Sequence, residues 1–103
     1  ASVDQLDFLA PAKKGDIMIL KSSVNFTGRS SMEVGVRIES ENPKTGVFQH
    51  TASAYLTFVS LNDNGKPQKV KEIYPESEAE ERRFYEGKKR YEERRNIKLL
   101  KAN

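Results

Sequence analysis

The strongest constraint on this 103-residue chain is an apolar sheet face that no other part of the sequence can cover. Most of residues 1–70 read as β-strands, each with its apolar side chains on one face. The only convincing helix follows Pro75 and is too polar to serve as the cover. Because a sheet must bury its apolar face against another layer, we expect the cover to come from a segment outside this sequence or from another chain.

Alternating apolar and polar residues predict four antiparallel strands. They cover residues 2–8, 17–26, 32–38 and 47–61. In the second strand the alternation assigns Phe26 to the same face as Val24. The fourth strand is far longer than the usual length of about five or six residues, so we expect a bend or a bulge along it.

A helix is predicted from about residue 77 to residue 99, on a C-terminal extension that covers residues 71–103. We interpret residues 1–70 as the sheet portion of a single domain. Ser77 and Glu80 have the capping-box spacing, in which a hydroxyl and a carboxylate satisfy N–H groups of the first turn. A thin apolar stripe, mainly Phe84 and Tyr91, predicts docking along one narrow line.

The basic residues of this helix have two interpretations. The simpler one is a solvated face with partners four residues apart, such as Glu86 and Arg90. The other assigns Arg90, Arg94 or Arg95 to the attraction of an anionic nucleotide on a neighbouring subunit. Gly87 interrupts the helix at a cost of about 1 kcal/mol relative to alanine.

Composition excludes several kinds of site. The chain has no cysteine and a single histidine, His50, so disulfides, thiolate nucleophiles, His-rich zinc sites and most Ser-His-Asp triads are ruled out. We interpret His50 as a partly buried structural residue, and Asp4 and Asp7 as markers of strand ends. The net charge of +3 supports nucleic-acid binding only weakly.

The sequence also carries signals of location. No apolar run is long enough to span a bilayer and no signal peptide is recognisable, so the prediction is a cytoplasmic protein without a membrane partner. The chain opens at Ala1 without an initiator methionine and directly in a strand, which suggests a domain fragment.

The most pointed local motif is the turn Thr27-Gly28-Arg29-Ser30-Ser31 between the second and third strands. A glycine turn can direct backbone N–H groups into one concavity, and an arginine adds a planar cationic fork. Both features suit a phosphate. The alternative is a hairpin turn with a polar tip, and the residues alone leave both interpretations open.

Several stretches in order resemble one family across nearly the whole chain. They are Ala1–Phe8 followed by Pro11 and Lys14-Gly15-Asp16, then Val24–Val34, His50–Val59 and Pro75–Phe84. Together they resemble the hotdog-fold acyl-CoA thioesterases, in particular the group that includes brain-type acyl-CoA hydrolase and its bacterial relatives.

The resemblance implies an α+β hotdog fold, in which a long antiparallel sheet wraps around one central helix. That helix and its preceding strand would precede Ala1 and would be absent here. The implied reaction is hydrolysis of fatty acyl-CoA to free fatty acid and CoA, with no metal and no cofactor. An acidic residue near the start of the central helix would activate water, so no catalytic residue is assigned in this chain.

The resemblance also implies where the substrate and partners bind. Thr27, Gly28, Arg29, Ser30 and Ser31 match the family segment near the CoA phosphates and pantetheine, and become the predicted CoA-binding residues. Active sites of the family form between two subunits, so a homodimer assembling into a hexamer, a trimer of dimers, is expected. The alternatives are a non-catalytic acyl-CoA-binding or assembly module and a basic nucleic-acid-binding domain.

Overall fold

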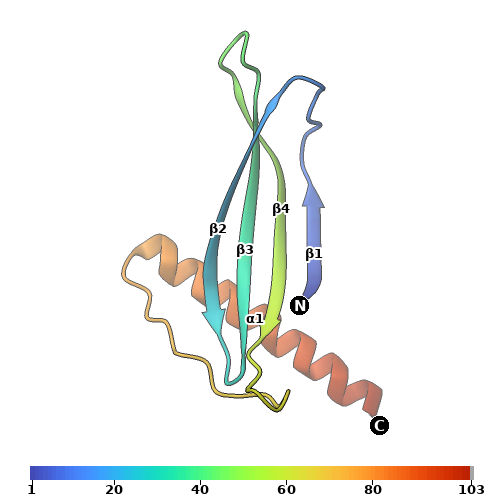
Figure 1. Ribbon diagram of the computed structural model, residues 1–103, viewed down its shortest axis with the longest axis vertical. Helices are drawn as coiled ribbons and strands as arrows, with labels where there is room; N and C mark the ends of the chain where they lie inside the picture. The colour runs from blue at the N-terminus through green and yellow to red at the C-terminus, as the bar shows by residue number, and fades with distance from the viewer. Residues whose placement is uncertain (103) are drawn as a thin grey trace. The chain divides into compact units, whose positions relative to one another are not determined.

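Four strands and one helix make up the structure, a computed structural model that describes the backbone of residues 1–102 and the side chains of residues 1–98. The elements are β1 (Ser2–Phe8), β2 (Ile17–Thr27), β3 (Ser31–Glu41), β4 (Phe48–Val59) and α1 (Glu78–Ala102). The strands lie side by side in the order β1-β4-β3-β2 (Figure 1). The predicted α+β architecture, an antiparallel sheet followed by a C-terminal helix, is therefore confirmed.

The fourth strand ends at Val59, two residues before the predicted end at residue 61. After β4 only an isolated bridge joins Leu61 to Pro67. Between them the Asn62 side chain accepts hydrogen bonds from the backbone N–H groups of Asn64 and Lys66, and Gly65 adopts a φ of +74°. A positive φ of this kind is typical of the glycine in an Asn-Gly dipeptide, so the turn forms where the sequence predicts it.

The irregularity expected in the long strand lies in its neighbour instead. Along β1 and β4 the pairing slips by one residue between Val3 and Gln5, so Asp4 is the extra residue. The Asp4 carboxylate accepts hydrogen bonds from the hydroxyls of Ser2 and Thr57. A bulge in β1 thus lets a short strand follow the twist of a longer one.

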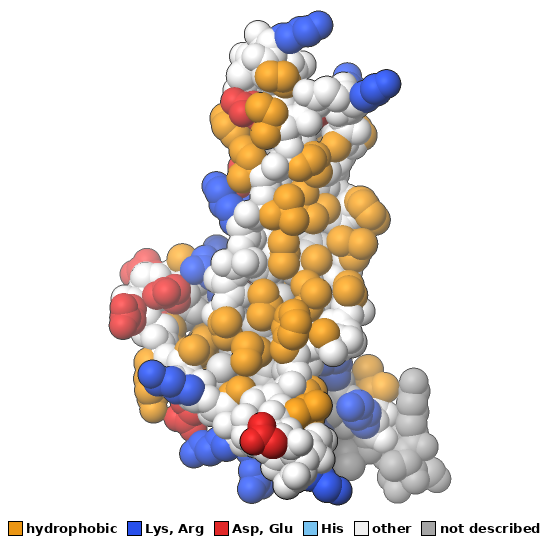
Figure 2. Space-filling view, viewed as in Figure 1, with side chains coloured by type: hydrophobic (Ala, Val, Ile, Leu, Met, Phe, Trp, Pro, Cys, Tyr) orange, Lys and Arg blue, Asp and Glu red, His pale blue; other side chains and the backbone are white. Residues whose placement is uncertain are grey.

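Residues 1–23 and 34–57 form one compact unit, in which the strands leave large apolar side chains exposed. Its buried apolar residues are the small Ala52 and Ala54, which pair in register with Phe8 and Leu6. Phe8 itself is 78% exposed, and Figure 2 shows hydrophobic side chains gathered along the strands. The exposed apolar side chains of this unit include Val3, Leu6, Phe8, Leu9, Ile17, Met18 and Leu20.

These exposed side chains should make the 103-residue chain bind hydrophobic dyes. Contiguous apolar patches of more than a few hundred Å² are rare on monomeric soluble proteins. We expect the chain to enhance the emission of anilinonaphthalene sulfonate, and Leu20→Ser to weaken that enhancement because Leu20 is 65% exposed. A titration of dye into the purified chain is the measurement. A compact monomer that leaves the emission unchanged would contradict the exposed apolar face.

Residues 24–33 and 58–103 form the second compact unit, built around Phe26 of β2. Its ring lies against Phe84 and Tyr91 of α1, with centroid distances of 5.1 and 5.5 Å. This contact confirms the docking line predicted from the helix sequence. Phe26 is 8% exposed under α1, whereas Val24, which alternation assigns to the same face, is 41% exposed.

At Gly87 the backbone of α1 closely approaches the hairpin of β2 and β3. A Cβ added there would lie 2.9 Å from Phe26 Cβ and 3.1 Å from Glu33 Oε1. The Cβ of Asn25 would be only 3.6 Å away, so consecutive residues of β2 both lie beneath this glycine. The glycine weakens the helix but lets its backbone approach the strands.

We therefore expect Gly87→Ala to lower the free energy of unfolding by about 1–3 kcal/mol, since the overlap with Phe26 outweighs the gain in helix propensity. Urea denaturation followed by circular dichroism measures the change. Lys88→Ala, at the next, exposed position, is the matched control and should leave the transition nearly unchanged. If helix propensity alone decided the outcome, Gly87→Ala would instead stabilise the chain.

Among the described residues, no helix combines the length and apolar character needed to cross a membrane.

The helix α1 is capped as its sequence predicts, because the backbone N–H of Glu80 donates to Ser77 Oγ at 3.1 Å. The Glu80 carboxylate accepts from the backbone N–H of Glu76, one residue before the position that the capping box predicts. The division of the chain at residue 70 into domain and extension stays a prediction.

Candidate functional site

The turn between β2 and β3 is held from behind by the segment that connects β4 to α1. The carbonyl of Arg29 accepts a hydrogen bond from the backbone N–H of Val70 at 2.9 Å. The carbonyl of Ser30 accepts one from the backbone N–H of Ser60 at 2.8 Å. Thr27 Oγ1 accepts from the backbone N–H of Ile73 at 3.3 Å. These hydrogen bonds join residues far apart in the sequence, so the connecting segment fixes the turn.

The turn closes differently from the predicted phosphate-binding nest. The backbone N–H of Gly28 donates to the carbonyl of Ser31 at 2.9 Å, and so it does not point at a ligand. Gly28 does not need a positive φ in this turn. A Cβ there would lie 3.3 Å from Tyr91 Cε2 and 3.2 Å from Ser31 Oγ, so a side chain at this position would crowd the tyrosine ring.

An open pocket of about 620 Å³ lies between the turn and the connecting segment. Its lining residues are Thr27, Gly28, Arg29, Lys69, Glu72, Ile73, Tyr74, Pro75 and Phe84. All of them belong to the second unit, and they combine cationic, acidic and apolar side chains. Such a pocket can hold an anionic group and the chain attached to it.

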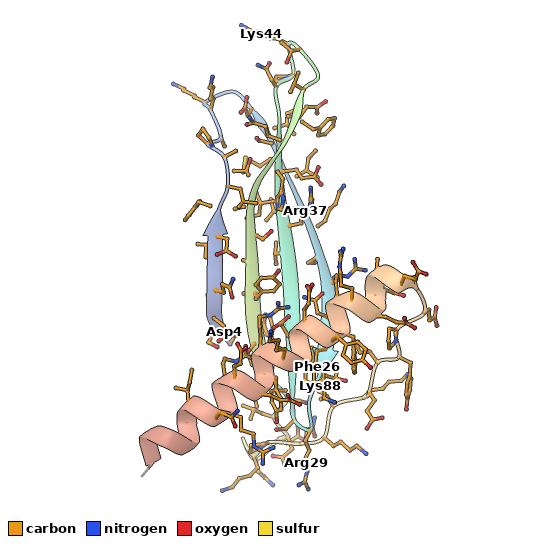
Figure 3. The ribbon with its side chains drawn as sticks, turned by 180° about the vertical axis from the view of Figure 1, so that it is seen from behind. Asp4, Phe26, Arg29, Arg37, Lys44 and Lys88 are labelled. Atoms are coloured by element: carbon orange, nitrogen blue, oxygen red, sulfur yellow. The ribbon has the colours of Figure 1, made fainter. Side chains whose placement is uncertain are left out.

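Two cations face this pocket from different segments. Arg29 lies at the tip of the hairpin, where Figure 3 shows its side chain extending outward, and Lys69 comes from the connecting segment. One acid, Glu72, also lines it and accepts a hydrogen bond from Tyr74 Oη at 3.0 Å. That hydrogen bond to Glu72 raises the pKa of the Tyr74 phenol, so this side chain stays a neutral donor.

The five predicted binding residues divide into two groups. Thr27, Gly28 and Arg29 line the pocket, whereas Ser30 and Ser31 are not among its lining residues. Ser30 and Ser31 are half-buried and use their carbonyls to hold the turn. Sequence reasoning missed Lys69, whose only signal is a run of lysines in the connecting segment, Lys66, Lys69 and Lys71.

Arg90 of α1 lies away from solvent, contrary to the interpretation of the helix as a solvated face. Its side chain is 20% exposed and pairs with Glu33 of β3 rather than with the predicted Glu86. The guanidinium donates from Nε and Nη2 to the two carboxylate oxygens, at 2.8 and 2.6 Å. Because Glu33 lies across a tertiary contact, no helical spacing could have predicted the pair.

His50 makes contacts that explain it without catalysis. Its Nε2 lies 3.1 Å from the carbonyl of Ala52 and 2.8 Å from Ser53 Oγ. Since a carbonyl only accepts, the contact with Ala52 needs the proton on Nε2, and that nitrogen cannot then deprotonate the serine. Asp7 accepts from Gln5 on the same strand, which fits its interpretation as a strand-end residue.

The described residues contain no group of three or more His, Cys, Asp or Glu side chains that could hold a metal ion. The site is thus defined by cations, hydroxyls and an apolar wall. These groups can bind and orient an anionic ligand.

Comparison with known proteins shows one consistent similarity. Residues 1–47 match the thioesterase superfamily. An acyl-CoA thioester hydrolase of Bacillus subtilis, itself uncharacterised, is 42% identical over 98 residues, which cover 95% of this chain and 57% of that protein. A cytosolic acyl coenzyme A thioester hydrolase of Mus musculus is 40% identical over 94 residues, covering 88% of this chain and 24% of that protein.

Solved structures give the same result. A hexameric acyl-CoA thioesterase in its apo form superposes with a TM-score of 0.87 at 39% identity, covering 97% of this chain and 64% of that one. The acyl-CoA hydrolase of Staphylococcus aureus, in complex with butyryl-CoA and CoA, superposes with a TM-score of 0.86 at 38% identity, covering 99% of this chain and 62% of that one. The chain thus spans about half to two thirds of its bacterial relatives and a quarter of the mouse relative.

Proposed function

Since this chain has the fold and the sequence pattern of the hotdog-fold acyl-CoA thioesterases, we propose that it forms the sheet portion of an enzyme that hydrolyses fatty acyl-CoA. The products would be a free fatty acid and CoA. The named activities of the Bacillus subtilis and Mus musculus relatives support this proposal. Because the chain spans only part of those proteins, the activity is proposed for the intact protein.

The observation that carries the proposal is the pocket between the turn and the connecting segment. Arg29 and Lys69 bring positive charge to this pocket, which would suit a CoA phosphate, and Thr27 adds a hydroxyl. A guanidinium binds phosphate oxygens through two parallel hydrogen bonds, and an ammonium acts as a point charge. We assign Thr27, Gly28 and Arg29 to CoA binding, with Ser30 and Ser31 as residues that hold the turn.

The chemical step would take place on the sheet face rather than in this pocket. We propose that a central helix from outside this sequence covers the apolar side chains of the strands and provides an acidic residue whose carboxylate takes a proton from the attacking water. Water would add to the thioester carbonyl, the C–S bond would break, and the CoA sulfur would leave and take up a proton. The reaction as proposed needs neither metal nor cofactor.

Assembly and location are proposals that rest on the relatives. We propose a hexamer built from dimers; the hexameric acyl-CoA thioesterase of the same fold supports the hexamer. A cytoplasmic location is supported by the mouse relative, which is named as cytosolic. The proposed partners are acyl-CoA and further copies of the chain.

The direct test is the release of CoA from a fatty acyl-CoA by the intact protein, followed with a thiol reagent. We expect turnover that saturates with substrate. Tight CoA binding without turnover would identify a non-catalytic binding module instead. A nucleic-acid-binding domain would retain DNA or RNA with an affinity that falls steeply with salt, and it would release no CoA.

A further inference from the structure

Glu33 is a carboxylate buried at the base of the hairpin that carries the turn. Its side chain is 1% exposed. Besides the two hydrogen bonds from Arg90, one of its oxygens accepts from Asn25 Nδ2 at 3.1 Å. A carboxylate so far from solvent is retained only where its partners satisfy it well. The ion pair therefore fixes a specific relative position of the groups that it joins.

Those groups belong to both strands of the hairpin and to the helix. Asn25 lies on β2 two residues before Thr27, and Glu33 lies on β3 two residues after Ser31. Arg90 of α1 binds the carboxylate of Glu33, and Asn25 donates to the same carboxylate. The network thus ties α1 to the hairpin immediately behind the turn.

The same helix face contacts the turn and the pocket directly. The Tyr91 ring lies so close to Gly28 that a Cβ at that position would be 3.3 Å away. Phe84 packs on Phe26 and also lines the pocket. Figure 3 shows Phe26 between the strands and α1, with Arg29 at the hairpin tip. A shift of α1 would therefore move the turn and one wall of the pocket together.

We propose that Arg90 is a positioning residue for CoA recognition: through Glu33 it holds the hairpin so that Arg29 faces the pocket opposite Lys69. This inference rests on the proposed function, because it assigns the pocket to the phosphates of CoA. Arg90 acts through Glu33 and touches no substrate. The helix of the C-terminal extension then belongs to the binding site rather than to a solvated tail.

A positioning role and a purely structural role predict different kinetics for two substrates. The first substrate is an acyl-CoA, and the second carries the same acyl group on N-acetylcysteamine, which has no phosphate. Loss of folded protein lowers the rates on both substrates equally. Misplacement of Arg29 affects only the substrate that has phosphates, so the ratio of the two kcat/KM values isolates positioning.

In the intact protein we expect Arg90→Met to lower that ratio about 10-fold, chiefly through the KM for acyl-CoA, since small misplacements of binding groups have large kinetic effects. Arg90→Lys keeps the charge but loses the fork, so it should fold even where Arg90→Met does not and should lower the ratio by a smaller factor. Lys88→Ala removes one exposed charge from the same helix and should leave the ratio unchanged.

The outcomes separate the two proposals. An unchanged ratio in both Arg90 variants, or equal losses on both substrates, overturns the positioning role. If the wild-type protein does not favour acyl-CoA over the truncated thioester, the assignment of the pocket to CoA phosphates fails, and the inference fails with it. A wild-type preference that Arg29→Ala abolishes, and that Arg90→Lys lowers, supports both.

Discussion

Glu33→Ala should lower the free energy of unfolding by about 3 kcal/mol, the largest effect that we expect from one substitution in this chain. The change removes a carboxylate whose side chain is 1% exposed and leaves Arg90, itself only 20% exposed, without the partner that binds both Nε and Nη2. Removing one partner of a buried pair is more damaging than losing an exposed pair. Urea denaturation is the measurement, followed by circular dichroism because the chain has no tryptophan.

Glu86→Ala is the matched control for this prediction. Glu86 precedes Arg90 by four residues on the exposed side of α1 and is the partner that helical spacing favours. We expect its removal to change stability little. A double-mutant cycle should give strong coupling between Glu33 and Arg90 and almost none between Glu86 and Arg90. The reverse result would mean that α1 does not dock on the hairpin as described.

Arg29→Ala should raise the KM for acyl-CoA in the intact protein by about 10- to 100-fold, with little change in stability. A hydrogen bond to a charged group contributes about 1.5–3 kcal/mol, and about 1.4 kcal/mol corresponds to a factor of ten. Arg29 is exposed at the hairpin tip, so its side chain is not needed for packing. The effect should shrink as the salt concentration rises, because salt screens exposed charges.

Two variants make this prediction specific. Lys69→Ala should raise KM in the same direction, since Lys69 lines the same pocket from the connecting segment. Lys88→Ala removes a charge of the same sign from the same unit, outside the pocket, and should leave KM unchanged. If Arg29→Ala and Lys88→Ala behave alike, then general charge rather than a phosphate site explains the binding of acyl-CoA.

Local patterns in the sequence predicted most of the fold. Alternation identified four strands, and the cap formed by Ser77 placed the start of α1 correctly. These signals depend on neighbours in the sequence, which is why they survive without knowledge of the tertiary structure. The hotdog fold was recognised through motifs along the whole chain, and the superposition on solved thioesterases confirms it.

Features set by tertiary contacts could not be predicted in the same way. Glu33 and Arg90 are 57 residues apart, and nothing near either residue indicates the other. The contact of Phe26 with α1 does not follow from alternation, since Asn25 and Phe26 both lie close to Gly87. Lys69 lies on a connecting segment that has no periodicity, so its place in the pocket depends on backbone hydrogen bonds such as that from Val70 to Arg29.

We propose that the turn between β2 and β3, with the connecting segment, binds the phosphates of CoA. A crystal structure of the intact protein with CoA measures this directly. The account predicts phosphate oxygens within hydrogen-bonding distance of the Arg29 guanidinium, with the Lys69 ammonium nearby. CoA phosphates bound elsewhere, with this pocket filled only by solvent, would contradict it.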